Sequence, residues 1–182
     1  MRRITVVLAL ALAACGGRSH RNKIEIPPAA PPEAWRGVVS VAVMPPDCWT
    51  SDIDLEFVAW YRGLINEMLR ERGWSAVPCV AVNRGLNKLR FTMAGELGQL
   101  SPTATATHFG CDAMLYWSIL NSSGTVELAF ELVKGDGTRL WATGDAKLRL
   151  AFLAHPEGAD GKSQQMALAI GEALRGLPRR TP

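Results

Sequence analysis

The sequence predicts an α/β domain with a mixed five-stranded sheet and flanking helices, in the order β-α-β-α-β-β-β-α. Three observations lead to this fold class. The apolar, β-branched run at residues 37–44 is typical of a buried strand. A long segment with helical spacing of apolar residues follows it. Later in the chain, alternating segments joined by turn residues are typical of antiparallel strands with one face towards the core.

The first half of the domain predicts a strand, a helix and a second strand. Pro45–Pro46 ends the first strand. Ser51 with Asp54 three residues later resembles a capping box, and apolar side chains then recur at helical spacing as far as Gly73. Residues 74–82 read as a second strand, which the crossover would place parallel to the first.

The middle of the domain carries weaker helix signals and then two clear strands. A short helix is expected at residues 86–91. Another is expected to begin at Ser101-Pro102, where serine caps and proline occupies the first turn. Residues 111–120 predict a third strand, and residues 125–133 a fourth that alternates between apolar and acidic side chains.

The last part of the domain predicts a fifth strand and a final helix. Residues 139–150 alternate, which places Leu140 on the core face and Trp141 on the face towards water. Apolar residues from Met166 to Leu177 lie at helical spacing.

The amino terminus has the pattern of a signal peptide. Arg2 and Arg3 precede the apolar run at residues 4–12, which small residues follow up to Cys15. A transmembrane helix needs about 20 apolar residues, so this run is too short to span a bilayer. We therefore expect residues 1–14 to be a signal that is removed after export.

The tetrad that ends this segment, Leu12-Ala13-Ala14-Cys15, resembles the lipobox of bacterial lipoproteins. The resemblance implies that the Cys15 thiol carries a diacylglycerol and that its amino group is acylated, with fatty acids such as palmitate. Gly16 follows the cysteine, and by resemblance to enterobacterial sorting this favours the outer membrane, with the domain facing the periplasm.

Removal of the signal leaves 168 residues, enough for one domain and short for two. It also leaves 18 basic residues against 17 acidic ones, so nucleic acid is not an expected partner. Residues 15–36 are polar and proline-rich and read as a tether, in which the 20 residues 16–35 could reach about 60 Å. The globular domain is expected at residues 37–178, with a short tail at 179–182.

Several segments together resemble a known family. They are the strand ending in Val-Met-Pro-Pro, the long helix, Leu100-Ser101-Pro102, the run from Gly110 to Tyr116, and Leu140-Trp141. They resemble the bacterial lipoproteins typified by a genome-derived neisserial lipoprotein antigen, over most of residues 38–150. The element order is also similar to the TolB amino-terminal domain, the curli secretion lipoprotein and the exopolysaccharide secretion lipoprotein of the Pel system. The resemblance implies an assembly factor of the envelope and not an enzyme.

Two features invite a catalytic or cofactor reading, and neither is strong. Residues 158–163 end like a phosphate-binding loop, but position 156 is proline where that loop needs glycine, so a polar turn with a serine cap is the simpler expectation. His108 lies near Cys111 and Asp112, yet no second histidine stands at ligand spacing, so a helix-capping histidine is expected and no metal or cofactor.

Two further groups were weighed as site residues. Asp52, Asp54 and Glu56 could form a pair of catalytic carboxylates, but acids in a first helical turn are expected from the helix dipole alone. Trp49 lies in a predicted loop, and among the six tryptophans it is the one we expect to contact a partner.

Three cysteines remain once Cys15 is lipidated. Cys48 follows the first strand and Cys79 lies towards the end of the second, so both belong near one edge of the sheet, whereas Cys111 begins the third strand. We predict a Cys48–Cys79 disulfide; the alternative is three buried free thiols.

Two classes of function follow from the sequence. The favoured one is a non-catalytic, lipid-anchored binding or assembly module of an envelope secretion or transport complex, acting as a ring or as an adaptor. The alternative is a small-ligand binder or envelope enzyme that uses loops 45–51 and 83–86, at the carboxyl ends of the parallel strands.

Overall fold

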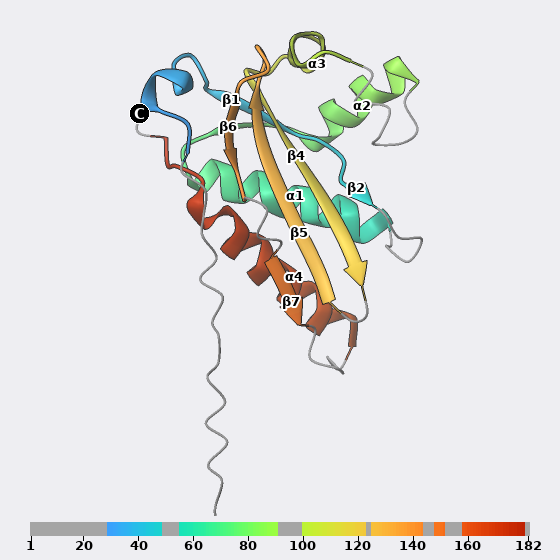
Figure 1. The fold of residues 1–182 in the computed structure, drawn as a ribbon. Helices are drawn as coiled ribbons and strands as arrows, with labels where there is room; N and C mark the ends of the chain where they lie inside the picture. Colours follow the sequence, from blue (N-terminus) through green and yellow to red (C-terminus); the bar gives the residue numbers. More distant parts are fainter. Residues whose placement is uncertain are drawn as a thin grey trace, which may run out of the picture.

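The fold is a single α/β unit in which helices cover both faces of a mixed sheet (Figure 1). The computed structural model describes residues 29–48, 55–90, 100–122, 125–143, 148–151 and 158–180. The predicted signal peptide, most of the predicted tether and the proposed Ser51 cap lie outside these residues.

The helices and strands occur in the predicted order, with two additional short strands. The strands are β1 (Ser40–Val43), β2 (Asp47–Cys48), β3 (Ser75–Val77), β4 (Ala113–Ser122), β5 (Thr125–Lys134), β6 (Arg139–Ala142) and β7 (Leu148–Ala151). The helices are α1 (Leu55–Glu71), α2 (Cys79–Leu89), α3 (Pro102–Phe109) and α4 (Gly158–Ala173), with 3-10 turns η1 (Pro32–Trp35) and η3 (Leu174–Gly176).

The sheet has five strand positions, in the order β3-β1-β4-β5-β6. β2 continues the position of β1 along β4, and β7 shares the position of β6 along β5. β1 is parallel to both β3 and β4, whereas β4, β5 and β6 are antiparallel. The predicted mixed five-stranded sheet, with its first two predicted strands parallel, is therefore confirmed.

Each face of the sheet carries its own hydrophobic core. α1 and α4 lie side by side across one face (Figure 1) and bury Ile65, Leu69 and Ile170 against the sheet residues Leu115 and Leu132. α2 and α3 cover part of the other face through a smaller cluster. This cluster comprises Ala42, Met44, Val82, Ala106, Phe109, Cys111 and Met114.

The predicted second strand at residues 74–82 is too long. β3 ends at Val77, and α2 begins at Cys79 and contains the residues that were expected to form a helix only from position 86. Pro78 separates the two elements, because proline has no N–H for the sheet ladder and suits the start of a helix. Val82 and Leu86 then share one face of α2 that packs on the smaller core.

The predicted fifth strand is two strands, and Trp141 does not face water. The pairing of β5 with β6 contains a register shift, in which Leu132 lies opposite Trp141 and Val133 opposite Arg139. Leu140 is the extra residue of this bulge, so the alternation restarts there. As a result Leu140 and Trp141 are both buried in the larger core.

The chain before β1 is part of the packed unit. Ala30 donates its backbone N–H to the carbonyl of Leu140 at 2.8 Å, and Trp35 stacks at a tilt on Trp74 with ring centroids 5.6 Å apart. At the other terminus, Arg180 donates its backbone N–H to the carbonyl of Arg72 at 2.8 Å. Both ends of the domain are thus fixed at one side of the molecule (Figure 1). Among the described helices, none is both long enough and apolar enough to cross a membrane.

Candidate functional site

A polar cluster, buried at Arg62 and Asn66, lies where the carboxyl ends of β1 and β3 meet α1 and α2. We call Arg62, Asn66, Cys79 and Asn83 the Arg62 cluster. Arg62 and Asn66 are one turn apart on α1, and Cys79 and Asn83 are one turn apart on α2. Because residues four apart share a helix face, each helix presents two polar side chains to the other.

Arg62 is the buried charge of this cluster. Arg62 as a whole residue is only 4% exposed. Nη1 donates to the side-chain oxygen of Asn83 at 2.5 Å, and Nη2 donates to the carbonyl of Val43 at 2.9 Å, at the end of β1. The third group, Nε, is buried and has no hydrogen-bond partner among the residues that the structure describes. Burial lowers the pKa of Arg62 from its ordinary value, and the nearby Cys79 sulfur opposes that shift.

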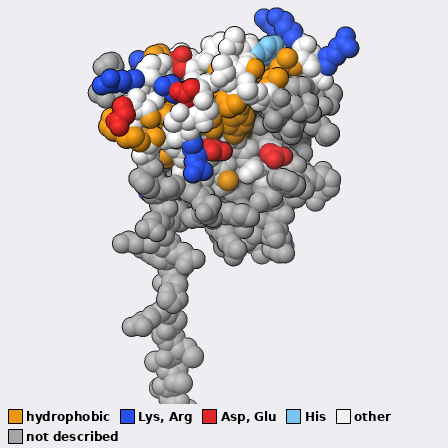
Figure 2. Space-filling view, turned by 45° about the horizontal axis from the view of Figure 1, so that its top comes forward, with side chains coloured by type: hydrophobic (Ala, Val, Ile, Leu, Met, Phe, Trp, Pro, Cys, Tyr) orange, Lys and Arg blue, Asp and Glu red, His pale blue; other side chains and the backbone are white. Residues whose placement is uncertain are grey.

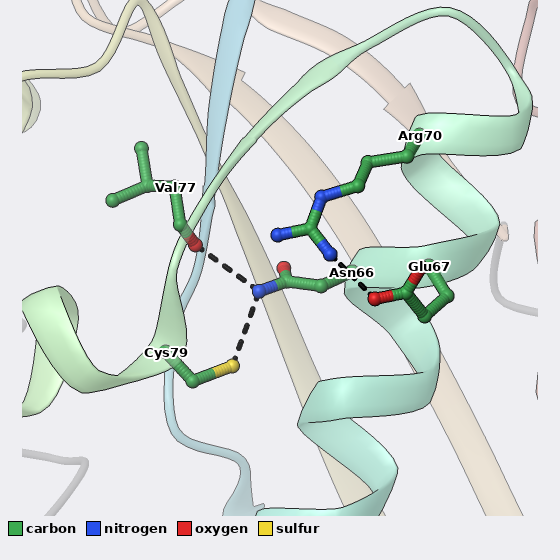
Figure 3. Close-up of polar contacts among 5 residues, drawn as sticks. All are labelled: Asn66, Glu67, Arg70, Val77 and Cys79. Atoms are coloured by element: carbon green, nitrogen blue, oxygen red, sulfur yellow. Dashed lines mark hydrogen bonds and ion pairs between the residues drawn. The ribbon is translucent and has the colours of Figure 1, made fainter.

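Asn66 joins α1 to the chain between β3 and α2. Its Nδ2 donates to the carbonyl of Val77 at 3.1 Å and to the Cys79 sulfur at 3.2 Å (Figure 3). Asn66 is only 3% exposed, and its Oδ1 has no partner. Figure 3 also shows the neighbouring Glu67–Arg70 ion pair, which lies on the exposed side of α1.

No carboxylate neutralises this cluster among the residues that the structure describes. The described ion pairs of α1 involve Glu67 and Arg70, not Arg62. The first turn of α2 contains no acidic residue, and its N-cap, Pro78, provides no side-chain cap. A helix amino terminus carries partial positive charge, so the cluster combines that charge with a buried guanidinium. Chemically, this arrangement can stabilise an anion or an ionised sulfur.

Sequence reasoning missed Arg62 and Asn66. The available signal was their position on the apolar stripe of α1, next to Tyr61, Ile65 and Leu69 in the chain. A polar residue at the edge of a core-facing stripe needs a partner when it is buried. Here the partners are strand-end carbonyls and α2 side chains, which no local pattern identifies.

The predicted group of His108, Cys111 and Asp112 has structural roles. His108 contacts the carbonyl of Gly85 in α2 at 3.0 Å through Nε2, and not the carbonyls of its own helix as expected. Cys111 is buried in the smaller core, which raises the pKa of its thiol to about 11. Within the described ranges, no three His, Cys, Asp or Glu side chains come close enough to hold a metal ion.

Asp112 links the start of β4 to the start of β1. One carboxylate oxygen accepts the backbone N–H groups of Val39 and Ser40 at 2.9 and 2.8 Å, and the Ser40 hydroxyl at 2.8 Å. We call Asp112 with these two residues the Asp112 junction. Burial alone would raise the pKa of Asp112, but these hydrogen bonds outweigh it and lower the pKa.

The other sequence candidates fall partly outside the described residues. Cys15, Trp49 and the side chains of Asp52, Asp54 and Glu56 lie outside them. Cys48 pairs with Ile119 through β2, but its side chain is not described, so the predicted disulfide remains a prediction. Cys79 and Cys111 are free cysteines in this structure.

Two predicted loops are helical instead. Residues 83–86 belong to α2, so they cannot act as a loop at the carboxyl ends of the strands. Residues 158–163 are the first turns of α4, where a polar turn with a serine cap was expected. In a helix the backbone amides beyond the first turn bond to preceding carbonyls, so this segment cannot wrap a phosphate as a phosphate-binding loop does.

Comparisons with known proteins support the fold. No family model and no curated protein sequence matches the chain. The lipoprotein GNA1162 from Neisseria meningitidis is similar in structure, with a TM-score of 0.58 and 19% identity over 76% of this chain and 99% of that one. This confirms the predicted resemblance to the neisserial lipoprotein as a similarity of fold.

Weaker similarities extend to two other proteins. The PelC dodecamer from Paraburkholderia phytofirmans gives a TM-score of 0.45 at 15% identity, over 79% of this chain and 90% of that one. The LpoB C-terminal domain from Salmonella enterica gives 0.42 at 18% identity, over 59% of this chain and 82% of that one.

Proposed function

We propose that this protein is a lipid-anchored lipoprotein of the bacterial envelope, whose domain works by binding other envelope proteins and not by catalysis. The Leu12-Ala13-Ala14-Cys15 tetrad supports the anchor, and Gly16 supports the outer membrane. The similarity of fold to a neisserial lipoprotein is consistent with this location.

The observation that carries the binding role is a partly uncovered sheet face on β4 and β5. Side chains that point towards α1 and α4, such as Trp117, Phe130 and Leu132, are buried. Their neighbours on the opposite face remain partly exposed. We call these neighbours the open face: Tyr116, Ser118, Ala129, Glu131 and Val133.

The open face has the mixed character of a binding surface. It combines an aromatic, two small side chains, an aliphatic one and the exposed Glu131–Arg139 ion pair at 3.8 Å. Figure 2 shows hydrophobic side chains gathered on the face turned towards the reader, between acidic and basic ones. Such a surface with a polar rim is typical of non-obligate protein interfaces.

The tether joins the domain at one side, which leaves the surfaces on the other side available to partners. Residues 29–35 enter beside β6, whereas β2 lies on the opposite side of the molecule (Figure 1). Trp49 directly follows β2 in the chain. We therefore propose Trp49, the residue after β2 in the chain, and the open face as the surfaces that contact partners.

The anchor is tested by Cys15→Ser, because no other residue at the cleavage site can form the thioether. We expect the variant to leave the membrane fraction after a high-salt wash. Full retention of the serine variant would show that something other than the lipid holds the protein.

The binding role is tested by crosslinking the full-length lipoprotein in its own envelope. Ala129→Arg places a long cation on the open face and should abolish the crosslinks formed there. Leu168→Arg is the matched control, because Leu168 is 69% exposed on α4, on the other side of the sheet. Crosslinks that survive Ala129→Arg unchanged would exclude the open face as the contact surface.

A second candidate function is the binding of a small ligand, and the Arg62 cluster is the observation that favours it. Its buried guanidinium has an unpartnered Nε and no described carboxylate beside it. The cluster lies at the carboxyl ends of β1 and β3, where ligands commonly bind in parallel α/β sheets.

A further inference from the structure

We propose that Cys79 is a nucleophilic thiol that exchanges with small disulfides, and that the Arg62 cluster activates it. The proposal goes beyond the binding role. It rests on the proposed export only for the source of the disulfide, since exported domains meet an oxidising compartment.

The position of the sulfur is the first reason. Cys79 is the first residue of α2, which is eleven residues long and has no acidic residue in its first turn. The partial positive charge of the helix amino terminus therefore acts on the sulfur without a competing carboxylate. Cys79 is half-buried, in contrast to the buried Cys111.

The second reason is a buried amide that bonds to the sulfur, with a buried guanidinium in its neighbourhood. Asn66 is 97% buried and aims its amide at the sulfur, while the other atom of the same amide, Oδ1, has no partner (Figure 3). Arg62, 96% buried, contributes a positive charge with an unpartnered Nε. Buried polar atoms normally have partners, and a catalytic or redox role is one of the explanations for those that lack them.

The exchange step balances without a further reagent. The ionised Cys79 sulfur attacks one sulfur of the disulfide, a new S–S bond forms and the old one breaks. The other half of the reagent leaves as a thiolate, which takes up a proton from water. Cys79 is oxidised and the leaving half is reduced. A second thiolate of the chain can then displace the bound half, which converts the mixed disulfide into an internal one.

The test uses the reduced full-length protein with oxidised glutathione as the probe. Cys48→Ser is included so that an internal disulfide with Cys48 cannot hide the first product. Peptide mapping by mass spectrometry should find glutathione on Cys79 at a rate at least about tenfold above that of Cys111, whose thiol is buried and ionises with difficulty. Modification of Cys111 at the same rate as Cys79 would overturn the proposal.

Asn66 is a positioning residue in this scheme, and it is tested through the rate of the reaction at each thiol. Asn66→Leu keeps a similar volume and removes the donor, so glutathione should attach to Cys79 more slowly while the rate at Cys111 stays unchanged. Arg70→Met is the matched control. It removes a cation from the next turn of α1, but one that is exposed and paired with Glu67 (Figure 3). An unchanged rate at Cys79 in Asn66→Leu, or an equal change in Arg70→Met, would contradict the proposed role of Asn66.

Discussion

The Asp112 junction and the Arg62 cluster lie at opposite ends of β1, and both are built on a charged side chain that bonds to backbone. At the junction, three donors converge on one carboxylate oxygen of Asp112. At the cluster, Arg62 and Asn66 keep one buried atom each without a partner. A fully satisfied charge stabilises the fold, whereas an incompletely satisfied one leaves bonding capacity for chemistry or a ligand. We therefore expect substitutions to affect stability at the first site and reactivity at the second.

The largest expected effect on stability comes from a disulfide at Cys79 of the Arg62 cluster. We predict that Cys48 and Cys79 form a disulfide in the oxidised protein, closing a loop of about 30 residues and adding about 3 to 4 kcal/mol if the bond is unstrained. Denaturant unfolding with and without reductant measures the gain, and non-reducing peptide mapping identifies the pair. A bond to Cys111, or three free thiols, would contradict the assignment.

Asp112→Ala should cost the fold about 2 to 3 kcal/mol, because it leaves the Val39 and Ser40 backbone donors without their charged acceptor. Equilibrium denaturation measures the loss. Asp136→Ala is the matched control, since this exposed carboxylate bonds to the backbone and side chain of Thr138 within one turn and pairs with Lys134, and joins no two strands. Equal losses in the two variants would show that the Asp112 junction stabilises the fold no more than an exposed turn carboxylate does.

Acid should weaken the Asp112 junction in a defined direction. The folded-state pKa of Asp112 is lowered, so its contribution is complete above its ordinary pKa of 3.8 and is lost as the pH falls through the lower folded-state value. The stability difference between the wild type and Asp112→Asn should therefore be constant near neutral pH and close below about pH 4. A difference that persists undiminished at pH 2 would exclude this linkage.

Arg62→Met should change stability by about 1 kcal/mol or less, because removing a buried charge recovers its desolvation cost and offsets the two lost hydrogen bonds. Thermal and denaturant unfolding both test this. A loss of about 3 to 5 kcal/mol is the signature of breaking a buried ion pair, and it would mean that Arg62 has a carboxylate partner.

Much of the fold could be predicted because its signals are local. Ser101 caps α3 by accepting the N–H of Ala104, as the Ser-Pro pair indicated. β5 keeps the alternation of residues 125–133, because an antiparallel strand with one buried face must alternate. The parallel pairing of β1 with β3 followed from the intervening helix.

The errors arose where one residue changes the backbone geometry. Pro78 divides a run that is continuously apolar, and hydropathy alone cannot distinguish a strand from a buried helix start there. The bulge at Leu140 is determined by the partner strand, so the segment's own alternation placed Trp141 on the wrong face. The Arg62 cluster was missed for a similar reason, since its partners come from three separate elements.

The attachment of residues 29–35 has a mechanical consequence. Tension applied through the amino-terminal chain first meets the Ala30–Leu140 backbone bond, the Trp35–Trp74 contact and the bond from Lys134 Nζ to the Ala34 carbonyl, before any load reaches the ladder of β1. These contacts break one after another. Breaking them therefore needs less force than separating parallel strands in shear, where several hydrogen bonds must break together. Release of residues 29–37 would lengthen the tether by about 30 Å, at 3.3 to 3.6 Å per extended residue. Residues 29–37 can thus detach and extend under load while the sheet stays folded.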